Sequence, residues 1–443
     1  MSRTLLIIPP GDFLVDQKVF PYLGILVIAK LLKDQGKDVD VLDLSGEKTI
    51  HIPDNYTHYG ITCLTPNMPR IKKICEEIRK MKDKRIILGG PHITVTGLAK
   101  SERSKRDWQD IKKISDVQVI GTGITWLEAL NNPNIQHTSN ETYTDWSAGT
   151  FYNDKPLEGD IIPLRSAIEL EDYHYEIDGK KATSLITQSG CPYNCSFCSG
   201  RGTKTYRSSV RRSTESIIEE ITDLESLEYR GFMLYDDELN VNKKAFNDLL
   251  LALIRHQEKT GIELSLRGFS RADLLTPEEA QLMRKAGFRW LLVGFESGSD
   301  EMLRAMNKGV TVAQNTKAIE IARAAGLKVK ALMSIGHPGE SHSTIKETKD
   351  WLLKIRPDEF DLTIISVYPG TPYYENAVHM GGVWVYMSPN GKRLYSKDIH
   401  FLSEESNYKG RPGEYTCHVW TDYLGPRELI KIRDEMEKEL KNV

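Results

Sequence analysis

The sequence has few cysteines and no long apolar run, and each shortage excludes a class of protein. Six cysteines among 443 residues are too few for a disulfide framework. No run of about 18 apolar residues occurs, so we expect no membrane span. The 59 basic and 62 acidic side chains leave a net charge of −3, which favours neither nucleic acid nor an anionic membrane as a partner.

Repeats and low-complexity tracts are also lacking, which excludes solenoids and disordered tails. The first apolar run, residues 5–8, ends at Pro9 and is too short for the core of a signal peptide. A chain of 443 residues exceeds the size of about 250–300 at which a single core stops growing. We therefore expect a cytoplasmic globular protein of more than one domain.

Residues 1–145 alternate short β-rich runs with helical patterns, which predicts an α/β domain of the doubly wound, Rossmann-like kind. Ligands of such sheets bind at the carboxyl ends of the strands. The expected strands cover residues 5–8, 39–44, 59–64, 85–88 and 117–120, and the expected helices cover residues 24–35 and 69–81.

The remaining chain divides into three expected parts. Residues 146–180 lack periodicity and predict a linker. Residues 181–375 resume strand–helix alternation and predict a six-stranded partial (β/α) barrel, with strands at 183–188, 231–235, 263–267, 290–294, 328–335 and 361–368. Residues 376–443 predict a small α/irregular region that shapes the substrate site and ends in a charged helix at 426–440.

Three of the six cysteines, Cys191, Cys195 and Cys198, lie within eight residues, directly after an expected strand. Three thiolates can bind three irons of a [4Fe–4S] cube and leave the fourth iron open to a ligand that is not protein. Two other interpretations stay open. A zinc site would need a fourth Cys or His at matching spacing, and buried thiols can also bind nothing.

This triplet, with Phe197 as an aromatic before its last cysteine, resembles the radical S-adenosylmethionine (SAM) superfamily. The resemblance implies that the three cysteines hold a [4Fe–4S] cluster whose open iron is chelated by SAM. It implies reductive cleavage to methionine and a 5′-deoxyadenosyl radical, with the electron supplied by a flavodoxin- or ferredoxin-type reductant. The backbone around Phe197 would then contact the adenine.

Four later segments repeat the pattern of the superfamily in the right order, and the resemblance assigns each of them to SAM. Acids after the second barrel strand would meet the methionyl ammonium, and an arginine after the third would meet its carboxylate. The plainer interpretations are solvated acids, a surface salt bridge and ordinary turns. The residues concerned are Tyr235, Asp236, Glu238, Ser270, Arg271, Glu296, Ser297, Ile335 and His337.

Small residues and prolines at the expected strand ends of residues 1–145 resemble the cobalamin-binding domain of the cobalamin-dependent radical SAM branch. Small residues there permit close approach of a flat corrin, and Thr65 would bind the nucleotide tail. A sheet that has lost its ligand is the plainer interpretation. The residues assigned to cobalamin are Pro10, Tyr22, Leu64, Thr65, Pro66, Gly89, Gly90, His92, Gly121, Thr122 and Gly123.

One departure from cobalamin proteins concerns the cobalt ligand. The Asp-x-His-x-x-Gly signature is absent after the first strand, and His92 fits a supporting or packing role better than an axial position. We therefore expect cobalamin without a protein imidazole on cobalt. The Gly121–Gly123 turn lacks a third glycine, so a dinucleotide is not expected.

The resemblance implies an enzyme that methylates an unactivated carbon, or phosphorus, of a small molecule. SAM would both remethylate cobalamin and generate the radical. The alternative is a radical cyclase or rearranging enzyme without net methyl transfer. A transfer-RNA methylthiotransferase would need three cysteines in the first domain, where only Cys63 and Cys75 occur, and an extra C-terminal cluster would need more than Cys417. The sequence names neither the substrate nor a catalytic acid or base.

Overall fold

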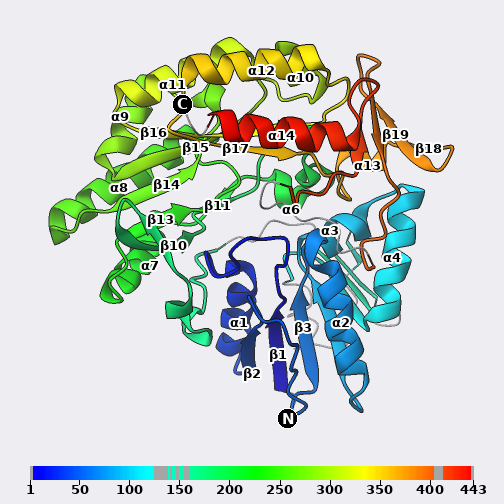
Figure 1. Cartoon of the computed structure of the whole chain (residues 1–443). Coiled ribbons are helices and arrows are strands. Elements are labelled where there is room, and N and C mark those ends of the chain that lie inside the picture. The colour runs from blue at the N-terminus through cyan, green and yellow to red at the C-terminus, as the bar shows by residue number, and fades with distance from the viewer. Residues whose placement is uncertain are drawn as a thin grey trace.

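The computed structural model describes residues 3–123, 138–139, 142–145, 149–153, 159–403 and 413–440. Two α/β lobes lie one above the other in Figure 1, an N-terminal lobe in blue and cyan and a barrel lobe in green to red. Within these described ranges, no helix is both long and apolar enough to cross a membrane.

The sheet of the N-terminal lobe has the strand order β2-β1-β3-β4-β5-β8-β7-β6. The first six strands in this order, β2-β1-β3-β4-β5-β8, pair in parallel. Strands β7 and β6 extend the sheet beyond β8 by antiparallel pairing. The order 2-1-3-4-5 is the flavodoxin-like one, whose switch point lies between β1 and β3. The bounds are β1 (Arg3–Ile8), β2 (Asp38–Asp43), β3 (His58–Thr62), β4 (Arg85–Gly89), β5 (Val117–Gly121), β6 (Thr138–Ser139), β7 (Thr142–Asp145) and β8 (Thr150–Asn153).

Successive side chains of β1 point to opposite faces of the sheet, and all four of its apolar side chains are buried, so both faces must be covered. Leu5 and Ile7 join one apolar core, and Leu6 and Ile8 join a second one. Helix α1 (Leu23–Asp34) closes the second core, and α2 (Met68–Arg79) closes the first. The structure confirms the predicted strands and both predicted helices, and adds α3 (Pro91–Leu98) and α4 (Glu102–Ile114).

The barrel lobe is a half-barrel of six parallel strands, as predicted, with one further antiparallel strand at its edge. Its strand order is β17-β16-β15-β14-β13-β10-β9. The bounds are β9 (Tyr175–Ile177), β10 (Lys180–Leu185), β13 (Gly231–Leu234), β14 (Ser265–Phe269), β15 (Phe288–Glu296), β16 (Lys328–Ile335) and β17 (Glu359–Ile364).

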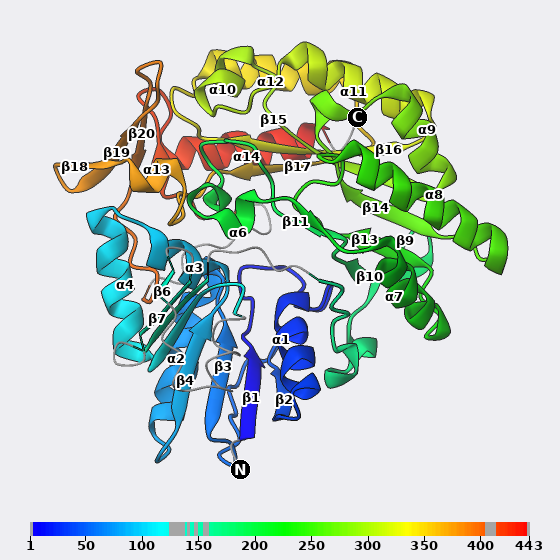
Figure 2. The same ribbon diagram turned by 180° about the vertical axis from the view of Figure 1, so that it is seen from behind.

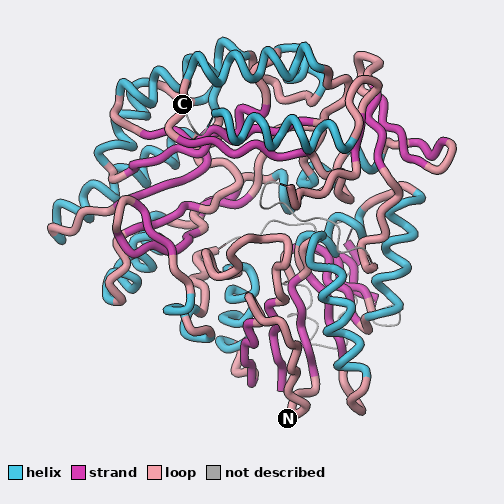
Figure 3. The backbone as a smooth tube through the Cα atoms, viewed as in Figure 1, coloured by secondary structure: helices cyan, strands magenta, loops and turns pink. Residues whose placement is uncertain are grey.

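Helices cover the outer face of this half-barrel, as Figure 3 shows. They are α7 (Thr214–Ser226), α8 (Lys243–Thr260), α9 (Pro277–Lys285), α10 (Asp300–Ala305), α11 (Val312–Ala324) and α12 (His342–Ile355). Side-chain caps start several of them. The Ser213 hydroxyl accepts from the Ser216 amide, and the Thr276 hydroxyl accepts from the Glu279 amide with Pro277 at the first helical position.

The interval 146–180 differs from the predicted linker, because it supplies a strand to each lobe. β8 pairs with β5 of the first sheet, and β9 pairs with β10 of the second. Strands of three or four residues are too short to give a readable alternation, so the sequence pattern did not reveal them.

The C-terminal region also differs from the α/irregular prediction. Helix α14 (Pro426–Leu440) has the predicted bounds, and Glu437 Oε1 accepts from the Leu362 amide of β17 at 2.8 Å. A four-stranded antiparallel sheet precedes the helix, formed by β18 (Val378–Met380), β19 (Val383–Met387), β20 (Arg393–Ser396) and β21 (Val419–Trp420). β18 is exposed throughout and β21 has only two residues, so no apolar pattern marks either of them in the sequence. The run of five apolar residues at β19 is a strand signal that the α/irregular prediction missed.

Candidate functional site

The cysteine loop follows β10 at the carboxyl end of the half-barrel. The short ladder of β11 (Gln188–Ser189) with β12 (Val210–Arg211) closes its base. Gly190 has φ +86°, and a Cβ there would lie 2.0 Å from the Ser208 carbonyl oxygen, so only glycine fits. The amides of Cys191 and Ser196 donate to the carbonyls of Tyr206 and Met306 at 2.8 and 2.9 Å. These bonds fix the loop to the chain on both sides.

The three thiols of the loop differ in their exposure to solvent. Cys195 is buried, Cys191 is half-buried and Cys198 is exposed. Within the described part of the chain, no three His, Cys, Asp or Glu side chains lie close enough to hold one metal ion. A [4Fe–4S] cube places each thiolate on a different iron, so its ligands lie further apart than those of a zinc ion. The loop can supply one thiolate to each of three irons, and it contains no fourth Cys or His that a zinc site would need.

The predicted carboxylates after β13 have different surroundings. Asp236 is 2% exposed and accepts from the Thr187 amide at 2.6 Å and from the Thr187 hydroxyl. It therefore holds the chain that leads into the cysteine loop. Glu238 Oε1 is shielded from solvent and has no hydrogen-bond partner among the described residues. Burial raises the pKa of Glu238 to about 7, against the opposing charges of Lys308 and Arg271. An unpaired buried carboxylate oxygen fits the methionyl ammonium of SAM.

We expect Glu238→Gln to weaken SAM binding by about 1.5 kcal/mol, about tenfold, because the amide keeps the shape but loses the charge-assisted bond. Iron content should not change. Binding of SAM to the anaerobically reconstituted protein, measured by equilibrium dialysis, checks this. Equal affinity of the wild type and the variant would assign the ammonium contact to another residue.

Arg271 lies against the cysteine loop. It is 5% exposed, its guanidinium carbon is 3.7 Å from the ring centroid of Tyr193, and its Nη2 donates to the Lys308 carbonyl at 2.7 Å. Ser270 is 3% exposed, and its hydroxyl has no partner among the described residues. Tyr235 is 53% exposed, with its ring 5.7 Å from that of Phe269.

The half-buried Glu296 and the buried Ser334 and His337 form a chain of polar contacts beside Phe197. Glu296 has φ +66° and accepts from Lys308 Nζ at 3.1 Å and from the Ser334 hydroxyl at 2.9 Å. The Ser334 hydroxyl also lies 2.8 Å from His337 Nε2, and the imidazole packs 5.6 Å from the Phe197 ring. Burial lowers the pKa of His337 to about 4, so this imidazole is neutral.

The other two residues assigned to SAM, Ser297 and Ile335, make local contacts with their side chains. The Ser297 hydroxyl lies 3.0 Å from that of Thr348 on α12 and accepts from the Ser299 amide, so it caps the local turn. The Ile335 side chain is 1% exposed and belongs to the barrel core, while its carbonyl accepts from the Ile365 amide.

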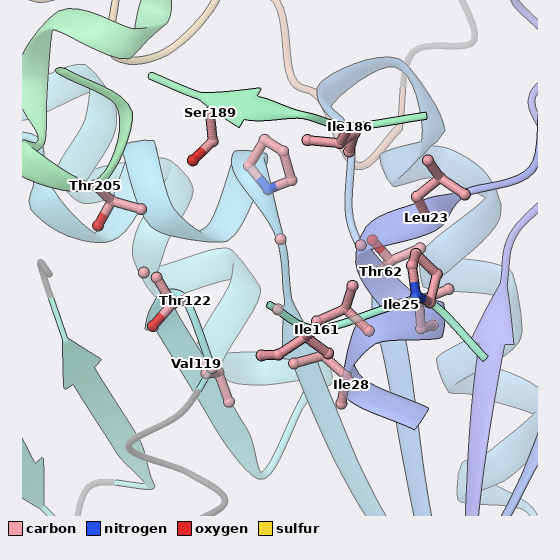
Figure 4. Close-up of a pocket in the computed structure, with 18 of the residues that line it drawn as sticks. Leu23, Ile25, Ile28, Thr62, Val119, Thr122, Ile161, Ile186, Ser189 and Thr205 are labelled. Atoms are coloured by element: carbon pink, nitrogen blue, oxygen red, sulfur yellow. The ribbon is translucent and has the colours of Figure 1, made fainter. Parts of the chain in front are cut away.

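A cavity of about 370 Å³ lies where the two lobes meet, and Figure 4 shows its lining. On one side are the first turn of α1 and the carboxyl ends of β3, β4 and β5, as expected for the flavodoxin-like switch point. On the other side is the chain that flanks the cysteine loop. The barrel-lobe residues in the lining are Ile186, Thr187, Gln188, Ser189, Thr205, Tyr206, Val210 and Arg212.

The lining brings together Gly89, Gly90, Gly121, Thr122 and Gly123 among the residues assigned to cobalamin. A Cβ on Gly90, at φ +98°, would lie 2.9 Å from the Cys63 amide nitrogen, so the wall there is necessarily backbone. This apolar, glycine-walled surface fits a flat corrin. Lining residues that the sequence analysis did not assign include Leu23, Gly24, Ile25, Val27, Ile28, Thr62, Ile161 and Pro163. The lining does not include Pro10, Tyr22, Leu64, Thr65, Pro66 or His92.

The side chain of His92 is packed against other side chains and does not line the cavity. It is 2% exposed, its Nδ1 lies 3.0 Å from the Thr65 hydroxyl, and its ring is 5.9 Å from that of Phe401. Burial lowers the pKa of His92 to about 3, so the imidazole is neutral.

We expect His92→Ala to leave the electron paramagnetic resonance spectrum of bound cob(II)alamin unchanged, because the imidazole is outside the cavity. The free energy of unfolding should fall by about 1–3 kcal/mol, since the Thr65 hydroxyl loses its buried partner. Nitrogen hyperfine splitting that disappears in the variant would instead make His92 a cobalt ligand.

A three-cysteine loop lies at the carboxyl end of a half-barrel, and the chain on either side of it lines a cavity at a flavodoxin-like switch point. This arrangement indicates an enzyme with two neighbouring cofactor sites. Comparison with known proteins agrees. The family model of the radical SAM superfamily matches residues 185–352, and that of the B12 binding domain matches residues 15–103. The chain belongs to the cobalamin-dependent branch of the radical SAM superfamily, whose cofactors are a [4Fe–4S] cluster, SAM and cobalamin.

Relatives match over nearly the whole chain. An uncharacterised methyltransferase of Pyrococcus horikoshii is 27% identical over 97% of this chain and 94% of its own length. Bacteriochlorophyllide d C-8(2)-methyltransferase of Chlorobaculum tepidum is 25% identical over 94% of this chain and 91% of its own. The structure of the radical SAM methyltransferase TsrM from Kitasatospora setae superposes with a TM-score of 0.68 at 19% identity, covering 84% of this chain and 75% of that one. At that identity the likeness shows the fold.

Proposed function

We propose that the protein is a methyltransferase that adds a methyl group to an unactivated carbon, or phosphorus, of a small molecule. When bound, SAM on the cluster supplies the hydrogen-abstracting radical, and cobalamin supplies the methyl group. A flavodoxin- or ferredoxin-type protein supplies the electron. The relatives named as methyltransferases over nearly the whole chain support this assignment.

The observation that carries the proposal is the shared wall of the cavity. Thr187 and Gln188 lead directly into the cysteine loop, and Thr205 and Tyr206 leave it, yet all four line the same cavity as Gly90 and its neighbours in the first sheet. A corrin site beside the cluster is what transfer of a methyl group from cobalamin to a substrate radical requires.

The residues of this chain have separate tasks in that reaction. Cys191, Cys195 and Cys198 bind the cluster, and Glu238 binds the methionyl ammonium of SAM. Arg271 orients the cysteine loop through Tyr193. The apolar lining around Ile25, Ile28 and Ile161 excludes water from the cobalamin side, which protects reactive intermediates.

The test is transfer of a trideuterated methyl group from labelled SAM. The reconstituted holoenzyme is incubated anaerobically with reductant and a metabolite extract, and mass spectrometry searches for products that gain this label. We expect a labelled product that requires both added cobalamin and an intact cysteine loop. Formation of 5′-deoxyadenosine with no labelled product would favour the radical cyclase or rearranging enzyme instead.

A further inference from the structure

Helix α4 of the N-terminal lobe is joined to the C-terminal region by a buried cation. Arg103 is 1% exposed, and its guanidinium carbon lies 4.0 Å from the ring centroid of Tyr374 and 5.1 Å from that of Trp384. Its Nη2 donates to the Lys397 carbonyl at 2.9 Å. A desolvated guanidinium is costly unless ring faces and acceptors replace its water. This contact therefore depends on a defined arrangement of the two lobes.

The same face of α4 makes two further hydrogen bonds with the C-terminal region. The Tyr374 hydroxyl donates to Asp107, and the Ser104 hydroxyl donates to Glu375 Oε1 at 2.6 Å. Figures 1 and 2 show α13 (Pro372–Glu375) beside the upper end of α4 from opposite sides. Arg103, Ser104 and Asp107 are polar but nearly fully buried, so they serve this contact rather than the solvated surface.

Residues 370–375, which we call the bridging segment, also contact both cofactor regions. Gly370 has φ +81°, and a Cβ there would lie 2.7 Å from Val95 Cβ and 3.1 Å from the Ser199 carbonyl oxygen. Val95 belongs to α3, whose first residue lines the cobalamin cavity, and Ser199 directly follows Cys198. The bridging segment is thus wedged between the cobalamin wall and the cysteine loop.

The carboxylate of Glu375 bonds both to the bridging segment and to α4. Glu375 Oε1 accepts from the Gly370 amide at 2.9 Å and from the Ser104 hydroxyl. The close approach at Gly370 is therefore fixed by the same side chain that anchors α4. A shift of α4 would move Gly370 against Val95 and Ser199.

We propose that the bridging segment, held on α4 by Arg103 and Tyr374, is a positioning element that sets the separation between the cobalamin cavity and the cysteine loop. Only the expected effect of this element on methyl transfer rests on the proposed function. Its role in setting the separation of the two sites does not. Arg103 and Tyr374 are not part of the cavity lining, so we infer that they act through the bridging segment. A misplacement of about 1 Å between reacting groups can slow a reaction by about a hundredfold.

The experiment measures the magnetic interaction between cob(II)alamin and the reduced cluster in the holoenzyme by electron paramagnetic resonance. It compares wild type with Tyr374→Phe, which removes one hydroxyl, and with Arg103→Met. Tyr56→Phe is the matched control, because the Tyr56 hydroxyl donates to Asp40 at 2.7 Å wholly within the N-terminal lobe. Cluster and cobalamin content are measured on the same samples.

We expect Tyr374→Phe and Arg103→Met to keep both cofactors but to change or broaden the spin–spin splitting, while Tyr56→Phe matches wild type. Arg103→Lys should behave like Arg103→Met, because an ammonium cannot stack between two rings. Methylated product per 5′-deoxyadenosine formed should fall by about tenfold or more.

An unchanged splitting in Tyr374→Phe, with wild-type cofactor content, would overturn the proposal. The proposal would also be overturned if the loss of methylated product in each variant were proportional to the fraction of that variant that is unfolded. If Arg103→Met fails to fold, Tyr374→Phe decides. Because the splitting needs only the two bound cofactors, it tests the positioning role even if the wild type transfers no methyl group.

Discussion

We expect simultaneous replacement of Cys191, Cys195 and Cys198 by alanine to abolish the iron–sulfur cluster. The wild type should hold about four iron and four sulfide per chain after anaerobic reconstitution, and the triple variant should hold almost none. The reason is that the loop offers only these three thiolates, and within the described residues the other cysteines, Cys63 and Cys417 among them, are buried elsewhere.

Iron and sulfide analysis together with the visible absorption band of the cluster checks this result. Cys75→Ala is a matched control, because it removes a buried thiol of α2 outside the loop. It should retain the full cluster. A triple variant that keeps the full complement of iron would show that other ligands hold the cluster, and the assignment of this loop would fail.

We expect Gly24→Trp to block the cavity in which we propose that cobalamin binds. Gly24 lies in the first turn of α1 and lines the cavity, and a Cβ there would meet no atom within 4 Å. The indole can therefore enter the empty space without straining the helix. We expect cobalamin binding to weaken by about 3 kcal/mol, about a hundredfold, because the corrin and the indole compete for one volume.

A titration of the apoprotein with hydroxocobalamin, followed by absorbance, measures the effect. Gly425→Trp is the matched control, since Gly425 is exposed and its Cβ would also meet nothing within 4 Å. This control should bind cobalamin as the wild type does, and both variants should keep the cluster. Unimpaired binding by Gly24→Trp would place cobalamin outside this cavity.

Much of the fold was predictable because local patterns agree with the tertiary structure. The parallel strands are short apolar runs followed by helices with caps such as Ser213 and Thr276, and both signals are visible in the sequence. Helix α4 was missed for the opposite reason. Its buried residues include Arg103, Ser104 and Asp107, whose burial depends on partners nearly 300 positions later in the chain.

The candidate site, like the fold, could be predicted from the sequence only where a local pattern marks its residues. The cysteine loop and the glycine turns at Gly89–Gly90 and Gly121–Gly123 follow local rules of cluster ligation and backbone approach. The opposite wall of the cavity, Ile186–Ser189 and Tyr206, comes from the other lobe, and no local pattern marks it. The split between Asp236, which accepts from Thr187, and Glu238, which has an unpaired oxygen, likewise follows from surroundings that only the folded chain shows.

The ratio of the two coproducts of SAM tests the central claim most directly. Methyl transfer through cobalamin, driven by the radical, consumes two SAM molecules for each product, one leaving as S-adenosylhomocysteine and the other as 5′-deoxyadenosine. With the substrate identified by the labelled methyl group, we expect the two coproducts and the methylated product in equal amounts. A ratio of S-adenosylhomocysteine to 5′-deoxyadenosine near zero would contradict methyl transfer, and S-adenosylhomocysteine without 5′-deoxyadenosine would contradict the radical step.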